Sequence, residues 1–550
     1  MVEWYTKQRM GDLPAIAARR WPAREAMVFE GRRWSFREFE REVDAAAKAL
    51  MALGVAPGEK VALWMPNRPE WLFLMFAVLK LGAVLVPLNT RYRVADLGYA
   101  VAQSNSATLI AVDRSGPVDY GSMLVEALPG LASQDKTALA VPGFPDLKRV
   151  VLFGSATPRG AWNWAEVAPL AAMVSDAALA QRAAAVDPDA MALICYTSGT
   201  TGNPKGVMHS HICLRNVVDQ SGRLGITFQD RIMCYLPLFH LYGFAEAALL
   251  GVMTGAAQIV TATFDPAEVL ELVERERATV LHGFDTHYRD IMVALDSRPT
   301  DLSSLRIGTF AAGMSSSQPI AEQAQRRLCP TVSGWGMSEC WAFVTMGFAL
   351  GPTAQRAEAS GFPMIGMEVR VVDAATGHDQ PVGQQGELWV RGYSVMLGYY
   401  DNPKATAEAI DAEGWLHTGD TVLMREDGHI RFLGRYKDML KVGGENVSPA
   451  EVEAWIMRLP AVAEVAVVGY PDPRLAEVGV AFVRLRPGES LGEEQVLAHC
   501  RGQIASFKIP RHVLFVAEMP MTASGKVQKH RLRDRALAEL GAPRPASSAA

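Results

Sequence analysis

Short apolar stretches rich in β-branched residues alternate with longer amphipathic ones through most of this 550-residue chain, and this alternation constrains the fold more than any other feature. The stretches that predict buried strands are 107–113, 149–153, 256–262, 278–284 and 305–310. Between two of them, residues 265–277 place their apolar side chains on one face of a helix. Such alternation is typical of α/β architecture with largely parallel sheets, so we expect a large region of layered α/β sheets.

The sequence changes texture twice toward its C-terminus. After about residue 360, shorter apolar stretches separated by Gly, Pro and Asp predict a β-rich subdomain over about 360–435. Because the chain is too long for one hydrophobic core, we expect an N-terminal domain at 1–435, a C-terminal domain at 436–540 and a disordered tail at 541–550. The C-terminal domain is expected to be small, mobile and α+β, with a helix in 449–460 and strands in 464–470, 478–488 and 513–520.

Charge and cysteine content exclude several classes of function. The chain carries 54 Lys and Arg against 59 Asp and Glu, a net charge of −5, so no strongly basic surface indicates a nucleic-acid partner. No two of its six cysteines have the close spacing of a zinc ribbon, and six in so long a chain do not make a disulfide framework. We therefore expect a reducing, cytoplasmic setting.

One stretch, 71–88, is apolar enough to raise the question of a membrane span. Lys80 interrupts it, and Gly82 divides a helix-like half from a strand-like half. We therefore expect a buried helix followed by a buried strand, and no integral membrane segment. The N-terminus has charges but no apolar core behind them, which argues against a signal peptide.

The strongest local motif follows the apolar stretch 191–196. It gathers hydroxyl groups, glycines and one lysine in a short segment that contains Thr197, Ser198, Gly199, Thr200, Thr201, Gly202 and Lys205. Glycines let backbone N–H groups turn toward one point and the hydroxyls add donors, so the segment predicts a cradle for phosphate oxygens. It is not a Walker A loop, because Pro204 stands where that motif has Gly and Lys205 is followed by Gly.

This segment resembles the phosphate loop of the adenylate-forming superfamily, which includes acyl-CoA synthetases, adenylation domains of peptide synthetases and beetle luciferases. Further motifs of that superfamily have counterparts in the same order, namely Trp335-Gly-Met-Ser-Glu339, His417-Thr-Gly-Asp420, Gly434-Arg435-Tyr-Lys437-Asp438, Lys441-Val-Gly-Gly-Glu-Asn446 and Pro520-Met-Thr-Ala-Ser-Gly-Lys526. Because several motifs agree in order along much of the chain, the resemblance is specific. It implies a two-domain ligase.

The resemblance implies an ATP site in the larger domain. Asp420 would accept hydrogen bonds from both ribose hydroxyls, and Arg435 would reach the ribose or the α-phosphate. Glu339 and Thr200 would hold Mg²⁺ beside the phosphates, because Mg²⁺ prefers oxygen ligands. Trp335 would stack on adenine, although a core position explains a buried tryptophan equally well on local grounds. The residues expected around the base are Gly313, Met314, Trp335, Gly336, Met337 and Ser338.

The resemblance also assigns catalytic work to the smaller domain. Lys526 would neutralise charge on the carboxylate and the α-phosphate while the acyl-adenylate forms. Because Lys526 lies far from the phosphate loop in the sequence, the two domains would have to close on one ATP. Lys437 occupies the hinge position, about which the small domain would rotate to admit coenzyme A. The loop that would then lie near the coenzyme A tunnel contains Lys441, Gly443 and Gly444.

A softer motif surrounds His240, in Pro237-Leu-Phe-His240-Leu-Tyr-Gly. It resembles the family stretch whose histidine lies at the entrance to the acyl pocket, near the reacting carboxylate. We expect that role rather than the role of a core histidine. The stretches 282–288 and 311–318 depart from the pattern of coumarate-ligase-like members, so no substrate specificity carries over. Pocket walls and core packing explain four nearby side chains equally well: Tyr242, Phe244, Phe284 and Met337.

A different chemistry is suggested by His209, His211 and Cys213. On a strand these three side chains would share one face, as metal ligands do. We expect a helix to begin directly after the phosphate loop, which would break that alignment. We therefore expect no metal site there.

Together these features predict an AMP-forming acyl-CoA synthetase. It would use ATP, Mg²⁺ and coenzyme A to convert a hydrophobic fatty, aromatic or alicyclic acid into acyl-AMP and then acyl-CoA. A homodimer is left open. Three alternatives also stay open: a ligase that loads a separate carrier protein, a luciferase-like oxygenase, and a non-catalytic nucleotide-binding homologue. The joint presence of Lys205, Glu339, Asp420 and Lys526 argues against the last.

Overall fold

The computed structural model describes residues 5–197, 204–311, 318–373, 376–435, 440–447, 449–520 and 527–541. The chain forms two units. The first comprises Met1–Thr90, Val101–Cys195 and Gly206–Gly434, and the second comprises Arg91–Ala100, Tyr196–Lys205 and Arg435–Ala550. The domain boundaries expected at 435 and 540 stay predictions, and the predicted disordered tail lies outside the described residues except for Gly541.

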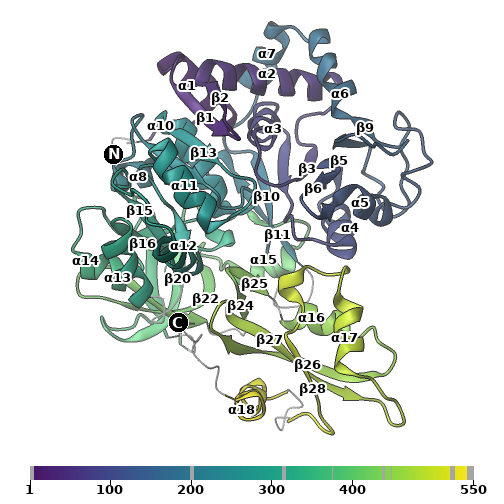
Figure 1. Cartoon of the computed structure of the whole chain (residues 1–550), viewed down its shortest axis with the longest axis vertical. Helices are drawn as coiled ribbons and strands as arrows, with labels where there is room; N and C mark the ends of the chain where they lie inside the picture. Colours follow the sequence, from purple (N-terminus) through teal and green to yellow (C-terminus); the bar gives the residue numbers. More distant parts are fainter. Residues whose placement is uncertain are drawn as a thin grey trace. The chain divides into compact units, whose positions relative to one another are not determined.

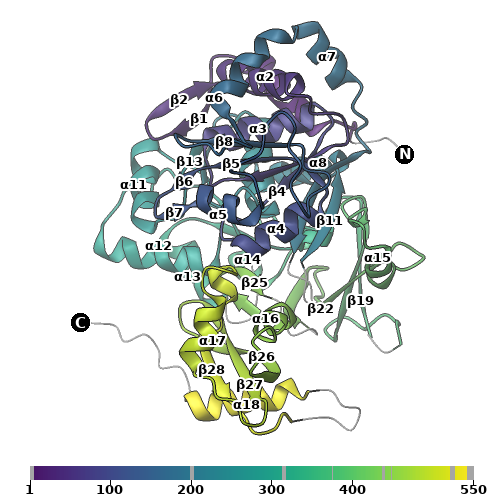
Figure 2. The same ribbon diagram turned by 90° about the vertical axis from the view of Figure 1, so that its right-hand side faces the viewer.

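An eight-stranded sheet contains the apolar stretches of the first part of the chain. Its order is β21-β11-β10-β4-β3-β5-β8-β9, with bounds Gly398–Tyr399, Lys205–Ser210, Met191–Thr197, Val84–Pro87, Lys60–Trp64, Ser106–Val112, Arg149–Phe153 and Trp162–Asn163. Neighbours from β10 to β9 are parallel, whereas β11 pairs antiparallel with β21. Every residue of β5 is buried, as expected for a parallel strand covered on both faces. Figure 2 shows α3 (Pro69–Lys80) on one side of β5 and α5 (Tyr120–Ala127) on the other.

The apolar stretch 71–88 folds as a buried helix and a buried strand, which confirms that expectation. Helix α3 begins with Pro69, a residue whose fixed φ suits the first turn. Gly82 adopts φ +69°, which turns the chain into β4. Lys80 pairs with Asp44 of α2 (Phe36–Ala52), so its charge is compensated. No helix formed by the described residues is long and apolar enough to cross a membrane.

Two further sheets of the first unit contain the strands predicted between residues 256 and 310. One has the order β12-β13-β1-β2, with bounds Arg231–Cys234, Ala257–Val260, Glu25–Phe29 and Arg32–Ser35. The other has the order β14-β15-β16-β17-β18, with bounds Gly283–Phe284, Gly308–Ala311, Thr331–Trp335, Thr345–Met346 and Phe362–Pro363. The helix predicted at 265–277 is α11, which precedes α12 and α13 (Figure 1); their bounds are Pro266–Glu276, Asp285–Ser297 and Gln318–Arg327.

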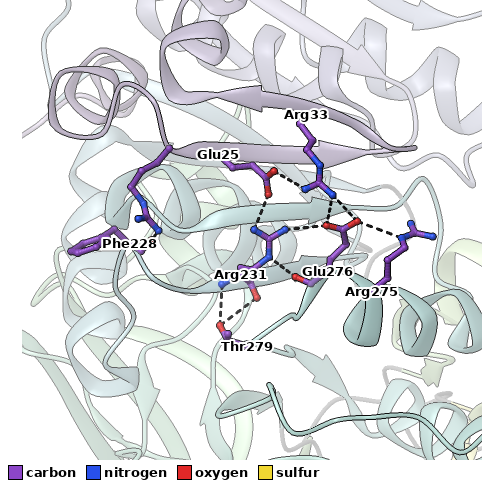
Figure 3. A network of polar contacts seen from close by, with 8 residues as sticks. Glu25, Arg33, Phe228, Arg231, Arg275, Glu276 and Thr279 are labelled. Atoms are coloured by element: carbon purple, nitrogen blue, oxygen red, sulfur yellow. Dashed lines mark hydrogen bonds and ion pairs between the residues drawn. The ribbon is translucent and has the colours of Figure 1, made fainter.

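A network of charged side chains fastens the β1–β2 hairpin to β12 and α11 (Figure 3). Glu25 forms ion pairs with Arg33 and Arg231, with nitrogen–oxygen distances of 2.6 and 2.8 Å. Glu276, the last residue of α11, is contacted by the same two arginines at 2.8 and 3.1 Å, and its side chain is 5% exposed. Burial alone would raise the pKa of Glu276, but the hydrogen bond from Arg33 and the charges of both arginines outweigh it and lower that pKa.

A β-rich region follows in the first unit. Its four-stranded sheet has the order β19-β20-β22-β23, with bounds Met367–Val372, Gln385–Gly392, Leu416–Met424 and Ile430–Arg435. β20 pairs antiparallel with both β19 and β22. Helix α15 (Pro403–Ala409) lies between β21 and β22 along the chain. The layered α/β sheets and this β-rich sheet confirm the expected fold class.

The second unit has the α+β character expected for the C-terminal part. Its sheet has the order β25-β24-β27-β26, with β28 beside β27; the bounds are Glu445–Val447, Leu440–Val442, Ala476–Leu485, Val462–Asp472 and His512–Phe515. Successive residues of β26 enter two separate apolar clusters. Val467 shares one with Val452 of α16 and Val496 of α17, whereas Val468 shares the other with Leu532 of α18. The sheet therefore has a helical layer on each face, formed by α16 (Pro449–Ile456) and α17 (Glu493–Cys500), and by α18 (Lys529–Leu540).

The remaining elements close to the candidate site are short. They are α4 (Val94–Gln103), α8 (Leu214–Leu224), α9 (Leu241–Gly243), the π-helical turn η4 (Phe244–Leu249), α10 (Leu250–Thr254) and the 3₁₀ turns η3 (His211–Cys213) and η6 (Ser338–Cys340). Other helices are α1 (Leu13–Arg20), α6 (Trp164–Val167), α7 (Asp176–Ala184) and α14 (Thr353–Glu358).

Candidate functional site

The predicted phosphate loop connects β10 to β11. Thr197 is the last residue of β10 and Lys205 is the first of β11. The residues between them that the motif singles out lie outside the described part of the chain: Ser198, Gly199, Thr200, Thr201 and Gly202.

Two tyrosines tie the ends of this loop to one helix. The Tyr196 hydroxyl donates to the carbonyl oxygen of Ala100 at 3.1 Å, and the Tyr99 hydroxyl donates to the carbonyl oxygen of Pro204 at 3.1 Å. Ala100 and Tyr99 both belong to α4, so the helix holds the chain on both sides of the loop. Sequence reasoning missed Tyr99, because no motif surrounds it.

The prediction of a helix directly after the predicted phosphate loop is wrong, because residues Lys205–Ser210 form strand β11. Strand pairing decides the structure here, since Val207 and Met208 pair with Tyr399 and Gly398 of β21. The ring of His209 lies 2.6 Å, through Nε2, from the carbonyl oxygen of Ser338.

We expected no metal site at His209, His211 and Cys213. The structure shows these side chains in other contacts. The Sγ atom of Cys213 lies 3.6 Å from Nδ1 of His209, and Nδ1 of His211 accepts a hydrogen bond from the backbone N–H of Met10 at 3.2 Å. Burial lowers the pKa of both histidines to about 4, so both are neutral at pH 7. Among the described residues, no group of three or more His, Cys, Asp or Glu side chains could hold a metal ion.

The segment from Trp335 to Glu339 leaves the end of β16 and enters η6. Gly336 is required in this turn, because a Cβ atom there would lie 2.0 Å from the carbonyl oxygen of Ala342. The indole Nε1–H of Trp335 donates to Oδ2 of Asp420 at 3.0 Å, and both side chains are buried. Two residues assigned separately to adenine and ribose are therefore in contact.

Hydrogen bonds of the Thr-Gly-Asp segment fix the backbone of β22 at Asp420. Gly419 has φ +67°, a conformation that favours glycine. The Thr418 hydroxyl donates to the carbonyl oxygen of Leu388 at 2.6 Å and accepts from the backbone N–H of Asp420 at 3.1 Å. The backbone N–H of Gly419 donates to Oε1 of Glu387 at 2.9 Å, a partner that sequence reasoning missed. Asp420 is only 3% exposed.

The carboxylate of Glu339 is positioned from β21. The Tyr399 hydroxyl donates to its Oε1 atom at 2.8 Å, and the backbone N–H of Met396 donates to the Glu339 carbonyl oxygen at 2.8 Å. Because Tyr399 pairs with Val207 of β11, the strand that follows the phosphate loop also fixes the predicted metal ligand. Gly336, Met337 and Ser338 are half-buried, between the buried Trp335 and Glu339.

His240 is half-buried and precedes α9. Two residues later, Tyr242 is buried in a polar network: its hydroxyl lies 2.6 Å from the Thr309 hydroxyl and donates to the carbonyl oxygen of Gly283 at 3.2 Å. The Tyr242 ring lies edge-on to the ring of Phe284, with centroids 5.0 Å apart. Two of the aromatic side chains considered as pocket walls, Tyr242 and Phe284, thus pack together, and Tyr242 has a polar partner that hydrophobicity alone did not reveal.

Of the predicted coenzyme A loop, the structure describes a tight hairpin. β24 and β25 pair through Val442 and Glu445, and the two residues between them, Gly443 and Gly444, have φ +57° and +85°. Two successive residues with positive φ are the signature of a type I′ hairpin turn, which explains the two glycines. The backbone N–H of Lys441 donates to Oε2 of Glu477 at 3.1 Å.

The side chains of the other predicted site residues lie outside the described part of the chain. Arg435 is the last residue of β23, and its side chain is outside the described part of the chain. Four more residues lie outside the described ranges altogether: Gly313, Met314, Lys437 and Lys526.

Comparison with known proteins gives the family. Residues 15–400 match the AMP-binding enzyme family, and residues 451–526 match the AMP-binding enzyme C-terminal domain. The chain is 38% identical over 522 residues to the 3-[(3aS,4S,7aS)-7a-methyl-1,5-dioxo-octahydro-1H-inden-4-yl]propanoyl:CoA ligase of Mycobacterium tuberculosis, covering 94% of this chain and 96% of that protein. It is 33% identical over 534 residues to the mitochondrial medium-chain acyl-CoA ligase ACSF2 of Danio rerio, covering 95% and 87%.

Solved structures agree with these matches. The amide bond synthetase McbA from Marinactinospora thermotolerans is similar with a TM-score of 0.80 at 27% identity, covering 96% of this chain and 99% of that one. The anthranilate CoA ligase AuaEII is similar with a TM-score of 0.70 at 27% identity, covering 98% of both chains. With both parts of the chain matched and the Trp335–Asp420 contact in place, the protein belongs to the AMP-binding enzyme family, as an AMP-forming acyl-CoA synthetase.

Proposed function

We propose that this protein joins a hydrophobic carboxylic acid to coenzyme A at the expense of ATP. In the first step a carboxylate oxygen bonds to the α-phosphorus, the bond from that phosphorus to the bridging oxygen breaks, and pyrophosphate leaves. In the second step the coenzyme A sulfur bonds to the acyl carbon, the acyl–phosphate bond breaks, and AMP leaves. The observation that carries this proposal is the buried contact between Trp335 and Asp420 within a chain that matches the family in both its parts.

The contact between Trp335 and Asp420 suits a nucleoside. Asp420 accepts from Trp335 through one oxygen, and an ionised carboxylate has enough lone pairs to accept from ribose hydroxyls as well. Because the indole edge of Trp335 is engaged by Asp420, its ring face is the part suited to stack on adenine. Thr197, Lys205 and the hydroxyl and glycine residues between them would hold the phosphates, and Arg435 would contribute a fixed cation.

A divalent cation fits beside this site. The Glu339 carboxylate is a hard oxygen ligand, and its contact with Tyr399 fixes its direction. Together with the Thr200 hydroxyl it would hold Mg²⁺, which when bound would neutralise negative charge on the phosphates.

Lys526 would complete the adenylation site from the C-terminal domain. Its ammonium group would reduce repulsion between two anionic reactants, the carboxylate and the α-phosphate. Rotation about Lys437 would then exchange this lysine for the hairpin that contains Gly443 and Gly444, which would border the incoming coenzyme A. The N-terminal domain at 1–435 and the C-terminal domain at 436–540 would be the moving bodies.

The relatives suggest two kinds of acid. One relative acts on a propanoate that carries two keto groups on a bicyclic ring, and the other on medium-chain acids. Either acid is largely apolar, which suits the aromatic side chains after His240, namely Tyr242 and its ring neighbours Phe284 and Phe343.

Mass spectrometry tests the proposal directly. Purified protein with Mg-ATP, coenzyme A and a panel of medium-chain, alicyclic and aromatic acids should yield acyl-CoA and AMP in equal amounts. Acyl-AMP without thioester, with thioester appearing only on an added carrier protein, would move the assignment to a carrier-loading ligase. Amide formation with added amines would instead indicate the activity named for McbA. ADP and phosphate as products would overturn the proposal.

A variant separates the two half-reactions. Lys526→Ala should lower acid-dependent pyrophosphate release at least about 100-fold, since electrostatic groups of this kind contribute that much. Conversion of supplied acyl-AMP to acyl-CoA should stay within about threefold of the wild type. Lys529→Ala is the matched control, because Lys529 is already paired with Glu453 at 2.7 Å. Equal loss of both half-reactions in folded Lys526→Ala would contradict the proposed domain rotation.

A further inference from the structure

A glutamate lies in the aromatic segment that follows His240. Glu246 belongs to η4, six residues beyond His240, in the run Phe244-Ala-Glu-Ala-Ala-Leu249. Its side chain is completely buried, and neither carboxyl oxygen has a hydrogen-bond partner. A buried carboxyl group without partners is rare in folded proteins, because it loses its hydration without replacement.

The backbone around Glu246 is also unusual. Residues Phe244–Leu249 form a π-helical turn between α9 and α10, and such turns are rare and often found at functional sites. The turn begins two residues after Tyr242, whose hydroxyl is bonded to Thr309 and Gly283. Phe244 itself lies between two tryptophans, with ring centroids 6.3 Å from Trp71 and 6.0 Å from Trp341.

The surroundings of Glu246 keep it neutral. Burial raises its pKa to about 8, and the nearby amide of Gln220 offsets this only in part. The Nε2 atom of Gln220 donates one hydrogen to Oδ1 of Asn216 at 2.6 Å, and neither carboxyl oxygen of Glu246 meets Gln220 at normal hydrogen-bond geometry. Burial raises the pKa of the Tyr242 hydroxyl, and Glu246 is close enough to Tyr242 for its charge to raise that pKa further. A neutral carboxyl group can donate a hydrogen bond as well as accept one.

We propose that Glu246 determines acid specificity by donating a hydrogen bond to an oxygen atom of the acid that lies far from the reacting carboxylate. The acid would then carry a keto or hydroxyl group on an otherwise apolar ring or chain. This inference rests on the proposed function. Of the two kinds of acid named there, it selects the oxygen-bearing one over the plain medium-chain acid.

The chemistry of selection follows from the missing partners. A site built to bond a substrate oxygen discriminates strongly against an analogue without it, because the site's own polar group then stays buried and unpaired. A purely apolar site discriminates far less between the same two acids. Glu246 would therefore supply discrimination between the two acids that aromatic rings alone do not provide.

The test compares two acids of one carbon skeleton: a bicyclic propanoate with a ring ketone and the same propanoate without it. Acid-dependent pyrophosphate release gives kcat/KM for each acid with wild type, Glu246→Gln and Glu246→Leu. We expect wild type to prefer the keto acid at least about tenfold. Glu246→Gln keeps a hydrogen-bond donor and should keep most of this preference, whereas Glu246→Leu should reduce the ratio to about one, mainly by losing the keto acid.

Two outcomes overturn the inference while the proposed function stands. One is a ratio of the two kcat/KM values that Glu246→Leu leaves unchanged. The other is an equal loss for both acids together with a lower unfolding midpoint, which would mean that Glu246 serves only the fold. In contrast, our inference requires Glu246→Leu to unfold at or above the wild-type midpoint, because leucine replaces an unpaired polar group. If wild type activates no acid of any class, the proposed function itself fails, and this inference fails with it.

Discussion

Two buried glutamates of the first unit have opposite surroundings. Glu276, at the end of α11, lies between Arg33 and Arg231, and their charges lower its pKa despite burial (Figure 3). Glu246, in η4, has no ion pair among the described residues, and burial raises its pKa to about 8. A glutamate is thus an anion that links secondary-structure elements at position 276 and a neutral acid at position 246.

The difference teaches how to tell a structural carboxylate from a functional candidate. Glu276 joins α11 to β2 and β12, and its ion pairs give it a clear role in the fold. Glu246 forms no ion pair among the described residues, so its burial lowers the stability of the fold and no contact offsets this loss. A group with a raised pKa, no ion pair and a place in the segment proposed to bind the acid is the better candidate for contact with substrate.

The largest effect should come from breaking the paired site. We expect Glu276→Gln to lower the free energy of unfolding by about 2 kcal/mol, because it removes a charged acceptor from two arginines. Chemical denaturation followed by tryptophan fluorescence measures this. Glu271→Gln is the matched control in the same helix: Glu271 is 48% exposed and pairs with Arg275 at 2.7 Å, so its loss should change stability by less than about 0.5 kcal/mol. Equal losses for both variants would contradict the comparison.

A smaller effect should appear at the unpaired site, and only as pH rises. Because the folded pKa of Glu246, about 8, exceeds its ordinary value of 4.5, the folded protein holds a proton that the unfolded chain releases between these values. Stability is therefore full below pH 4.5 and falls as pH rises toward 8. Glu246→Gln lacks this titration, so we expect it to match the wild type at pH 5 and to exceed it by about 1 kcal/mol at pH 8, since relaxation absorbs part of the burial cost. A constant difference at all pH values would refute the assigned pKa.

The smallest effect should be the loss of the Glu276 contribution to stability at acidic pH. The pKa of Glu276 lies below its ordinary value of 4.5, so its stabilising contribution is present above that pH and is lost as pH falls through the folded pKa. The stability difference between wild type and Glu276→Gln should therefore shrink by about 0.5 kcal/mol between pH 5.5 and 4. The two glutamates would then show pH dependences of opposite sign. A difference that grows on acidification would mean that another group dominates this corner.

Local sequence predicted the buried strands and the site motifs well. Apolar stretches such as 107–113 and 149–153 became β5 and β8, because a strand buried on both faces needs a continuous apolar run. The motifs around Gly336 and Gly419 were identified from the sequence. The structure supplies a reason for each glycine, because a Cβ atom at 336 would clash with the Ala342 carbonyl oxygen and Gly419 has a positive φ. Such features depend on a few adjacent residues.

Features set by distant parts of the chain were missed. β11 is a strand because it pairs with β21, almost two hundred residues later, and nothing near Lys205 indicates this partner. Tyr99 and Tyr399 each act through one hydrogen bond to a remote segment, so no spacing pattern marks them. Glu246 stands alone in an apolar run, where a single carboxylate looks like the exposed face of a helix until burial is known.

The hydrogen bond between Trp335 and Asp420 also makes the site observable with light. A ribose that engaged Asp420 would change the electric field and the bonding at the indole nitrogen, and indole emission is sensitive to both. Titration of ATP into wild type and Trp335→Phe would isolate this signal from the other tryptophans of the chain. Trp335 would thus serve as a reporter group inside the proposed nucleotide site, and binding could be followed without a label and before any acid has been identified.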